Sequence, residues 1–188
     1  MMSKGKLFII SGASGVGKST VLKKVMAARE DLLFSVSATT RPPRPSEEEG
    51  VSYYFVTKEK FEQMIAQDAF LEYDAHNNNW YGTPTFEVEE KLQQGHVILD
   101  IEPVGAFNVL KKRPDATLIF IDAPSWEELE RRLRGRGDTA EDQIAIRLER
   151  AKWELEQKPK YDFVVVNDQA QACADRILHI IAQAADMN

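Results

Sequence analysis

The sequence predicts an α/β protein whose core is a parallel β-sheet flanked by helices. Short apolar runs rich in β-branched and aromatic residues recur at 7–11, 96–101, 117–122 and 162–167. These runs show little polar alternation, which indicates strands buried on both faces, as in a parallel sheet covered by helices. Right-handed crossovers are then expected, with binding sites at the carboxyl ends of the strands.

The amphipathic stretches between these runs predict helices. Apolar residues recur at helical spacing over 18–29, 125–134, 139–157 and 170–185. At the start of the second stretch, Ser125 and Glu128 have the spacing of a capping box, in which a hydroxyl and a carboxylate satisfy free backbone N–H groups. Strand and helix patterns therefore alternate through most of the chain.

The segment from about residue 35 to residue 95 has a different pattern. Its stretch "SVSATTRPPRPSEEEGVSYYFV" combines prolines and arginines with closely spaced Tyr, Phe and Val. This composition predicts short antiparallel strands rather than another βαβ unit. We interpret the segment as a small lobe inserted into the parallel-sheet core.

Composition limits the classes of function. The chain has 188 residues, 43% of them hydrophobic, and a formal net charge of −6, which favours a single domain and argues against general affinity for nucleic acid or anionic membranes. One cysteine, Cys173, cannot form an intrachain disulfide, so a reducing compartment fits. No run approaches the roughly 18 apolar residues of a membrane span, and the first ten residues are too few for a secretory signal. A cytoplasmic location is expected.

The stretch "GASGVGKS" fits the phosphate-binding pattern G-x-x-x-x-G-K-S/T. Glycines let the backbone approach an anion with its N–H groups pointing inward, and the N-terminus of a helix adds its dipole. Lys18 would bring a positive charge to the β- and γ-phosphates, and the Ser19 hydroxyl would ligate Mg²⁺. A strand pattern ends at Ser11 and a helix pattern follows, as the motif requires. The predicted ATP-binding residues of this loop are Gly12, Ala13, Ser14, Gly15, Val16, Gly17, Lys18, Ser19 and Thr20.

The loop indicates a nucleotide but no particular reaction. A GTPase would need an N/T-K-x-D motif after a later strand to read guanine, and the nearest match, "TKEK" at 57–60, lacks the aspartate. The sequence instead contains a second group of anion-binding residues. Arg41 and Arg44 lie in the proline-rich "RPPRP", and forked guanidinium groups suit bidentate recognition of a phosphate. Tyr53 and Tyr81 would add hydroxyl donors.

A cluster of arginines lies near residue 135. Arg131, Arg132, Arg134 and Arg136 stand beside two glycines in "RRLRGRG", and Arg147 follows in the next predicted helix. The glycines allow hinge motion. We expect Arg136 and Arg147 to stabilise the charge of a phosphoryl group during transfer.

Taken together, these blocks resemble those of guanylate kinases, a family of P-loop nucleoside monophosphate kinases. The resemblance spans roughly residues 5–185 and rests on "SGASGVGKST", "FSVSATTRPPRPSEEEGVSYYFV", "FLEY", "WYGT", "ILDIE", "RLRGRG" and "VVVND" in the family's order. It implies transfer of the γ-phosphoryl group of ATP to GMP with Mg²⁺, and activity on dGMP. It also implies a core over about 1–34, 96–124 and 160–188, a GMP-binding lobe over about 35–95 and a lid over about 125–159.

The resemblance also assigns roles to individual residues. It implies that guanine is read by Ser37, Glu72 and Thr83, and that the GMP phosphate is bound by Arg41, Arg44, Tyr53 and Tyr81. Asp100 would lie near the GMP and the metal, and Asn167 near the adenine of ATP. The transfer arginines would be Arg132, Arg136 and Arg147. The chain departs from the family at Glu102, where an aspartate is usual, and at "PVG" over 103–105, where "WQG" is usual.

Two alternatives remain open at this point. A guanylate-kinase-like interaction module has the same fold but binds peptides, and it typically loses residues of the phosphate loop, which this chain retains. A kinase for another nucleoside monophosphate is the second alternative. Neither a monomer nor a homo-oligomer is favoured by the sequence.

Overall fold

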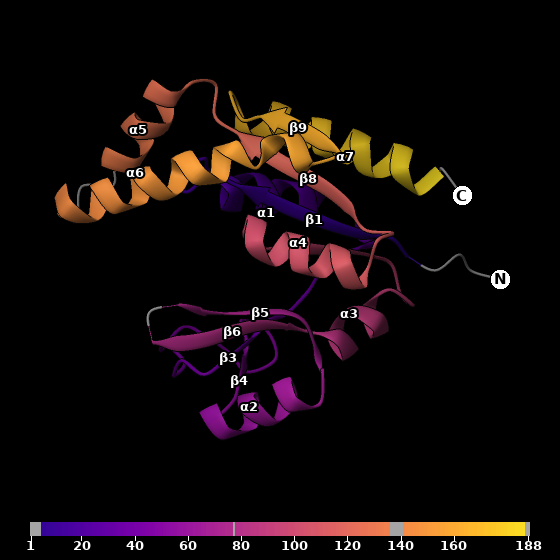
Figure 1. Ribbon diagram of the computed structural model, residues 1–188. Coiled ribbons are helices and arrows are strands. Elements are labelled where there is room, and N and C mark those ends of the chain that lie inside the picture. Colours follow the sequence, from indigo (N-terminus) through magenta and orange to yellow (C-terminus); the bar gives the residue numbers. More distant parts are fainter. Residues whose placement is uncertain (1–4, 77, 136–140, 187–188) are drawn as a thin grey trace. The chain divides into compact units, whose positions relative to one another are not determined.

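The computed structural model describes residues 5–76, 78–135 and 141–186 and confirms the predicted α/β class (Figure 1). A five-stranded sheet has the strand order β2-β7-β1-β8-β9. The pairs β2/β7, β1/β8 and β8/β9 are parallel. The five strands are β1 (Leu7–Gly12), β2 (Leu32–Phe34), β7 (His96–Asp100), β8 (Thr117–Asp122) and β9 (Phe163–Val166).

Burial explains why the apolar runs form this sheet. Every residue of β1 is buried, and so is the centre of β7 and of β8. Strand β9 differs from its prediction, because it lies at the edge of the sheet and exposes Phe163, Val164 and Val166. Strand β2 was not predicted, since three residues are too few to produce a pattern.

The four predicted helices are confirmed as α1 (Lys18–Ala28), α5 (Trp126–Arg134), α6 (Glu141–Glu156) and α7 (Ala170–Asp186). The Ser125 hydroxyl accepts the Glu128 N–H over 3.2 Å, as a capping residue should. The Glu128 carboxylate binds Arg131 and Arg132. Helices that the sequence reading did not locate are α2 (Lys58–Ala66), α3 (Thr85–Lys91), α4 (Pro103–Lys112) and the short 3₁₀ helix η1 (Lys158–Lys160).

The inserted segment forms its own four-stranded sheet, in the order β4-β3-β6-β5. Its strands are β3 (Ala38–Thr39), β4 (Tyr54–Phe55), β5 (Phe70–His76) and β6 (Asn79–Pro84). The pairs β5/β6 and β3/β6 are antiparallel as predicted, but β3/β4 is parallel, so the prediction was wrong for that pair. The long segment from 40 to 53 carries the chain back to the starting end of β3, which a hairpin turn would not do. Phe61 of α2 stacks on Phe70 at 4.4 Å and closes the lobe's apolar core.

The described residues divide into two compact units. One holds 5–7, 31–76, 78–99 and 104–116, and the other holds 8–30, 100–103, 117–135 and 141–186. The phosphate loop, Asp100, Glu102, α5 and α6 therefore lie in one unit, whereas the Arg41 loop, β5, β6 and most of α4 lie in the other. Among the residues described, no helix has both the length and the apolar character needed to cross a membrane.

Candidate functional site

The loop between β1 and α1 has the conformation that its glycines allow. Strand β1 ends at Gly12 and α1 begins at Lys18. Gly15 and Gly17 have φ angles of +86° and +88°, a region that side chains disfavour. A Cβ at Gly15 would lie 2.7 Å from Leu133, and one at Gly17 would lie 2.8 Å from the Asn167 side chain. Both positions therefore need glycine for conformation and for space.

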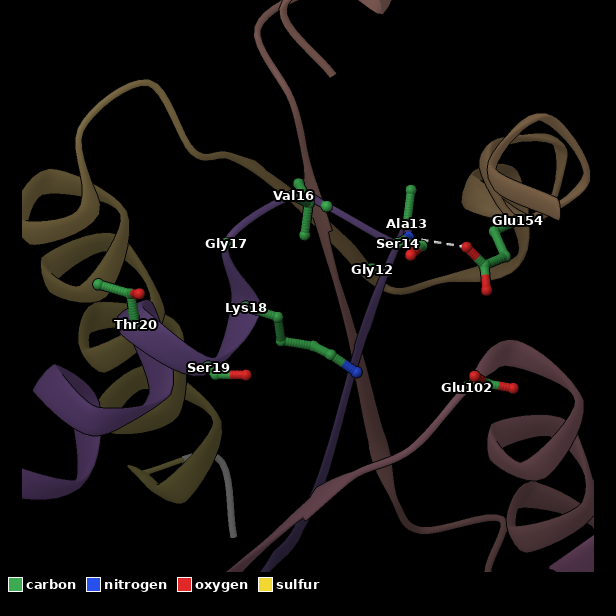
Figure 2. A pocket seen from close by; sticks show the side chains of 11 residues that line it. Gly12, Ala13, Ser14, Val16, Gly17, Lys18, Ser19, Thr20, Glu102 and Glu154 are labelled. Atoms are coloured by element: carbon green, nitrogen blue, oxygen red, sulfur yellow. Dashed lines mark hydrogen bonds between the residues drawn. The ribbon is translucent and has the colours of Figure 1, made fainter. Parts of the chain in front are cut away.

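The loop surrounds a pocket of about 240 Å³ (Figure 2). All of the predicted loop residues, 12–20, line it, together with Glu102 and Glu154. The first turn of α1 opens into the pocket, so its free N–H groups and its dipole favour an anion there. Ser19 and Thr20 are exposed to solvent.

Lys18 forms an ion pair with Asp100, the last residue of β7. The two side chains keep 19% and 26% of their surface exposed, so both are accessible to a ligand. Lys18, which lines the pocket, thus pairs with the carboxylate of a residue that is far away in the sequence. Asp100 lies at the carboxyl end of a parallel strand, where sites of α/β sheets are expected.

One wall of the pocket is acidic, and the sequence reading missed it. Glu154 of α6 is 2% exposed, and its Oε2 accepts the Ser14 N–H over 2.9 Å. Burial raises the pKa of the Glu154 carboxyl. Arg150 lies 3.3 Å from Glu154 Oε1 through its Nε and also pairs with Glu102. The sequence pattern that could have predicted its burial is helical spacing, which places Glu154 on the same face of α6 as the buried Ile144 and Ala151.

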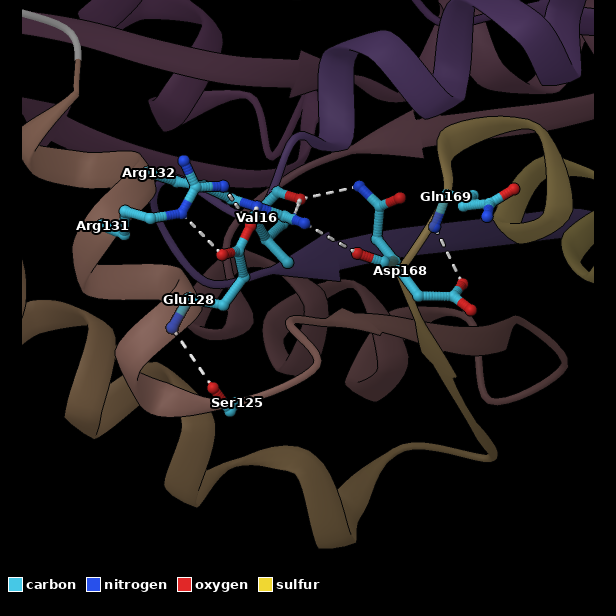
Figure 3. A network of polar contacts seen from close by, with 8 residues as sticks. Val16, Ser125, Glu128, Arg131, Arg132, Asp168 and Gln169 are labelled. Carbon is cyan, nitrogen blue, oxygen red and sulfur yellow. Dashed lines mark hydrogen bonds and ion pairs between the residues drawn. The ribbon is translucent and has the colours of Figure 1, made fainter.

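A polar network holds the other side of the loop (Figure 3). The Val16 carbonyl accepts from Asn167 Nδ2 at 2.8 Å and from Arg132 at 3.1 Å. Arg132 also donates to the Asn167 carbonyl at 3.2 Å and to Glu128 at 2.7 Å. Two predicted site residues, Arg132 and Asn167, are therefore next to the phosphate loop and bind its backbone.

Of the other two predicted transfer arginines, the structure describes one. Arg136 lies outside the described residues. Arg147 lies on α6 and is half-buried.

In the unit that contains the GMP-binding lobe predicted from the sequence, the Arg41 guanidinium is hydrogen-bonded to neighbouring residues of its own loop. Its two terminal nitrogens donate to the Glu47 carboxylate at 2.8 and 2.9 Å, and one also donates to the Pro42 carbonyl at 2.8 Å. The Tyr53 ring lies 5.4 Å from the guanidinium carbon, a cation–π distance, and contacts the Tyr81 ring edge-on at 6.0 Å. The predicted anion-binding residues Arg41, Tyr53 and Tyr81 are thus brought together.

Arg44 and Glu47 complete this cluster. The Arg44 N–H donates to Glu47 at 2.8 Å, and the Arg44 side chain is exposed. Glu47 therefore binds both predicted arginines, one through its guanidinium and one through its backbone. Glu47 is not among the site residues predicted from the sequence. The three-residue spacing between Arg44 and Glu47 is the sequence feature that could have predicted this contact.

Two of the three predicted base-reading residues are in contact. Glu72 of β5 and Thr83 of β6 are cross-strand partners, and the Thr83 hydroxyl donates to Glu72 Oε1 at 2.6 Å. Ser37 is half-buried immediately before β3, and its carbonyl accepts the Tyr54 N–H at 2.9 Å. Glu72 and Thr83 lie on β5 and β6, and Ser37 lies immediately before β3, which pairs with β6 in the same sheet.

The comparison with protein families decides the identity of the fold. The family model described as "Guanylate kinase" matches residues 4–184. The chain belongs to the guanylate kinase family. A guanylate kinase of Nostoc sp. is 48% identical over 174 residues, which cover 92% of this chain and 87% of that protein.

Further guanylate kinases support this assignment. One from Neisseria gonorrhoeae is 48% identical over 179 residues, covering 95% of this chain and 87% of its own length. The crystal structure of guanylate kinase from Anaplasma phagocytophilum superposes with a TM-score of 0.76 at 32% identity, over 99% of this chain and 89% of that one. The resemblance inferred from the motifs is confirmed.

Proposed function

We propose that this chain transfers the γ-phosphoryl group of ATP to GMP, giving ADP and GDP, and acts on dGMP in the same way. The observation that carries the proposal is the glycine-rich pocket at residues 12–20, with Lys18 directed into it, in a chain of the guanylate kinase family (Figure 2). Loop N–H groups, the helix dipole and one ammonium form a binding site for a polyphosphate. ATP would bind there.

Magnesium would enter this site with the nucleotide. Mg²⁺ usually keeps several waters and takes one or two protein oxygens together with substrate phosphates. Ser19 is exposed, lines the pocket beside Lys18 and has a hydroxyl oxygen to offer. The residues present therefore fit the ion, which would neutralise phosphate charge during transfer.

GMP would bind to the unit that contains Arg41 and Glu72, through its lobe at about 35–95. Arg41, Arg44, Tyr53 and Tyr81 would bind its phosphate through guanidinium and hydroxyl donors. Glu72 would read the base, because guanine presents N1–H and N2–H as adjacent donors and a carboxylate accepts from both. Thr83 and Ser37 would bind the remaining polar atoms of the base, and Asp100 would lie near the GMP and the metal.

Phosphoryl transfer depends mainly on positioning and on charge stabilisation. Arg132, Arg136 and Arg147, in the lid at about 125–159, would stabilise the charge on the phosphoryl group. Asn167 would lie near the adenine. Arg132 is already hydrogen-bonded to the loop that would hold the β-phosphate, through the Val16 carbonyl. An interaction module is the second candidate function, but the intact loop with Lys18 and Ser19 favours catalysis.

A coupled assay tests the proposal directly. ADP formation is followed with Mg-ATP and each of GMP, dGMP, AMP, UMP and CMP as acceptor. Turnover with GMP and dGMP that far exceeds turnover with the other three is the expected result. Turnover with AMP or a pyrimidine nucleotide above that with GMP would assign another monophosphate kinase, and no turnover with any acceptor would favour the interaction module.

A further inference from the structure

The carboxylate of Glu72, the proposed base-reading residue, packs against Gly105. Gly105 is buried in α4 and belongs to the same compact unit as Glu72. A Cβ built on Gly105 would lie 2.9 Å from Glu72 Oε2, 3.3 Å from its Cδ and 3.5 Å from its Cγ. A Cβ does not approach a non-bonded oxygen to 2.9 Å, so a side chain at 105 would displace the carboxylate.

The backbone gives no reason for a glycine at this position. Among the described residues, the glycines with positive φ are Gly15, Gly17 and Gly50, so Gly105 has a conformation that any residue adopts. Glycine inside a helix lowers its stability relative to alanine. The three nearest atoms that a Cβ would meet outside the α4 backbone all belong to the Glu72 side chain. Space for Glu72 is therefore what position 105 provides.

The other side of the carboxylate is also fixed. Thr83 is 1% exposed and donates to Glu72 Oε1, which leaves that oxygen little freedom. Oε2 lies against Gly105. A threonine hydroxyl and the bare face of a helix thus hold the two carboxylate oxygens in one orientation.

We propose that Gly105 is a specificity-determining residue that acts by positioning Glu72, a role that rests on the proposed function. A carboxylate accepts from N1–H and N2–H together only when both oxygens lie in the plane of the base at hydrogen-bonding distance. A methyl group at 105 would push Oε2 out of that arrangement. A displaced carboxylate can still accept one donor of the base but no longer two, so the additional bond that the N2 amine makes would be weakened, whereas binding of the GMP phosphate would be unaffected.

The test is the Gly105→Ala variant, assayed with GMP, IMP and AMP at saturating Mg-ATP. IMP has the N1–H of guanine but lacks its N2 amine. We expect KM for GMP to rise about tenfold, which corresponds to one weakened charge-assisted hydrogen bond. The preference for GMP over IMP should shrink, kcat should change less than KM, and KM for AMP should stay constant.

Stability separates positioning from a general structural role. Alanine is the better helix former, so the melting temperature of Gly105→Ala should equal or exceed that of the wild type. Val104→Ala, at the neighbouring and exposed position of α4, is the matched control and should behave like the wild type. In a double-mutant cycle, Glu72→Asp withdraws the carboxylate by one methylene, so Gly105→Ala should cost less in that background.

The results distinguish a positioning role of Gly105 from a structural one, and both from a failure of the proposed function. A wild-type enzyme that phosphorylates GMP, with the same GMP/IMP ratio in Gly105→Ala, overturns the role of Gly105 alone. Equal losses for all three acceptors with a lower melting temperature also overturn it, because they indicate a structural glycine. If Gly105→Ala does not fold, adding Glu72→Ala should restore folding, and failure of that rescue overturns the proposal. A wild-type enzyme without GMP turnover overturns the proposed function itself.

Discussion

The buried carboxylate of Glu154 accepts the backbone N–H of Ser14 over 2.9 Å, so α6 is tied directly to the phosphate loop. Its second oxygen lies 3.3 Å from Arg150, which also pairs with Glu102 at the rim of the pocket. One loop amide is therefore occupied by a protein carboxylate, and a negative charge lines a pocket suited to anions.

Glu154→Gln should change how stability depends on pH. Burial raises the pKa of Glu154, so the folded state binds this proton more tightly than the unfolded state does. The contribution of Glu154 to stability therefore falls as pH rises from the ordinary glutamate range through the raised pKa. The melting temperatures of the wild type and the variant are measured from pH 4 to pH 8. The melting temperature of the wild type should fall relative to that of Glu154→Gln as the pH rises. Glu156→Gln, at an exposed position of the same helix, is the control, and a difference independent of pH would contradict the argument.

Lys18→Ala should leave the protein folded and nearly inactive. The Lys18 side chain is partly exposed and pairs with Asp100 at the pocket rather than packing in the core. The variant loses the charge placed for the β- and γ-phosphates, so we expect kcat to fall by about 10²-fold or more. Circular dichroism checks the fold, and Lys23→Ala on the exposed face of α1 is the control. Turnover close to that of the wild type would refute the role of Lys18 in phosphate binding.

Glu72→Ala should remove the distinction between guanine and adenine. Adenine presents a bare N1 acceptor where guanine presents donors, so the carboxylate repels it. Charge-assisted hydrogen bonds contribute about 1.5–3 kcal/mol each, and loss of two should lower kcat/KM for GMP by at least about 10²-fold. kcat/KM for AMP should stay constant or rise. Glu62→Ala on the exposed face of α2 is the control, and equal losses for GMP and AMP would mean that Glu72 only supports the lobe.

Glu47→Gln should remove a contribution to stability that is confined to pH values above the acid range. The bidentate bond from Arg41, with the Arg44 N–H, lowers the pKa of Glu47 to about 2. A lowered folded pKa means that the contribution is complete above the ordinary glutamate pKa and disappears as pH falls from there towards 2. The difference in melting temperature between wild type and Glu47→Gln should therefore shrink between pH 5 and pH 2. Glu48→Gln is the neighbouring exposed control, and a constant difference would exclude ionisation of Glu47 as its source.

The parts predicted correctly from sequence are those in which neighbouring residues carry the signal. Four core strands, four helices and the loop at 12–20 depend on local hydrophobic patterning and on glycines at fixed spacing. Strand β2 and the parallel pair β3/β4 were missed, because very short strands owe their pairing to other segments.

By itself, the sequence determined the α/β class, the phosphate loop and membership of the guanylate kinase family, since each is encoded in a continuous pattern. Only the tertiary structure decided which distant side chains meet. It brought Asp100 to Lys18, Glu154 to the Ser14 amide and Gly105 to Glu72. The physical reason is that a charged side chain removed from water needs a partner or space, and that partner is chosen by packing rather than by position in the chain.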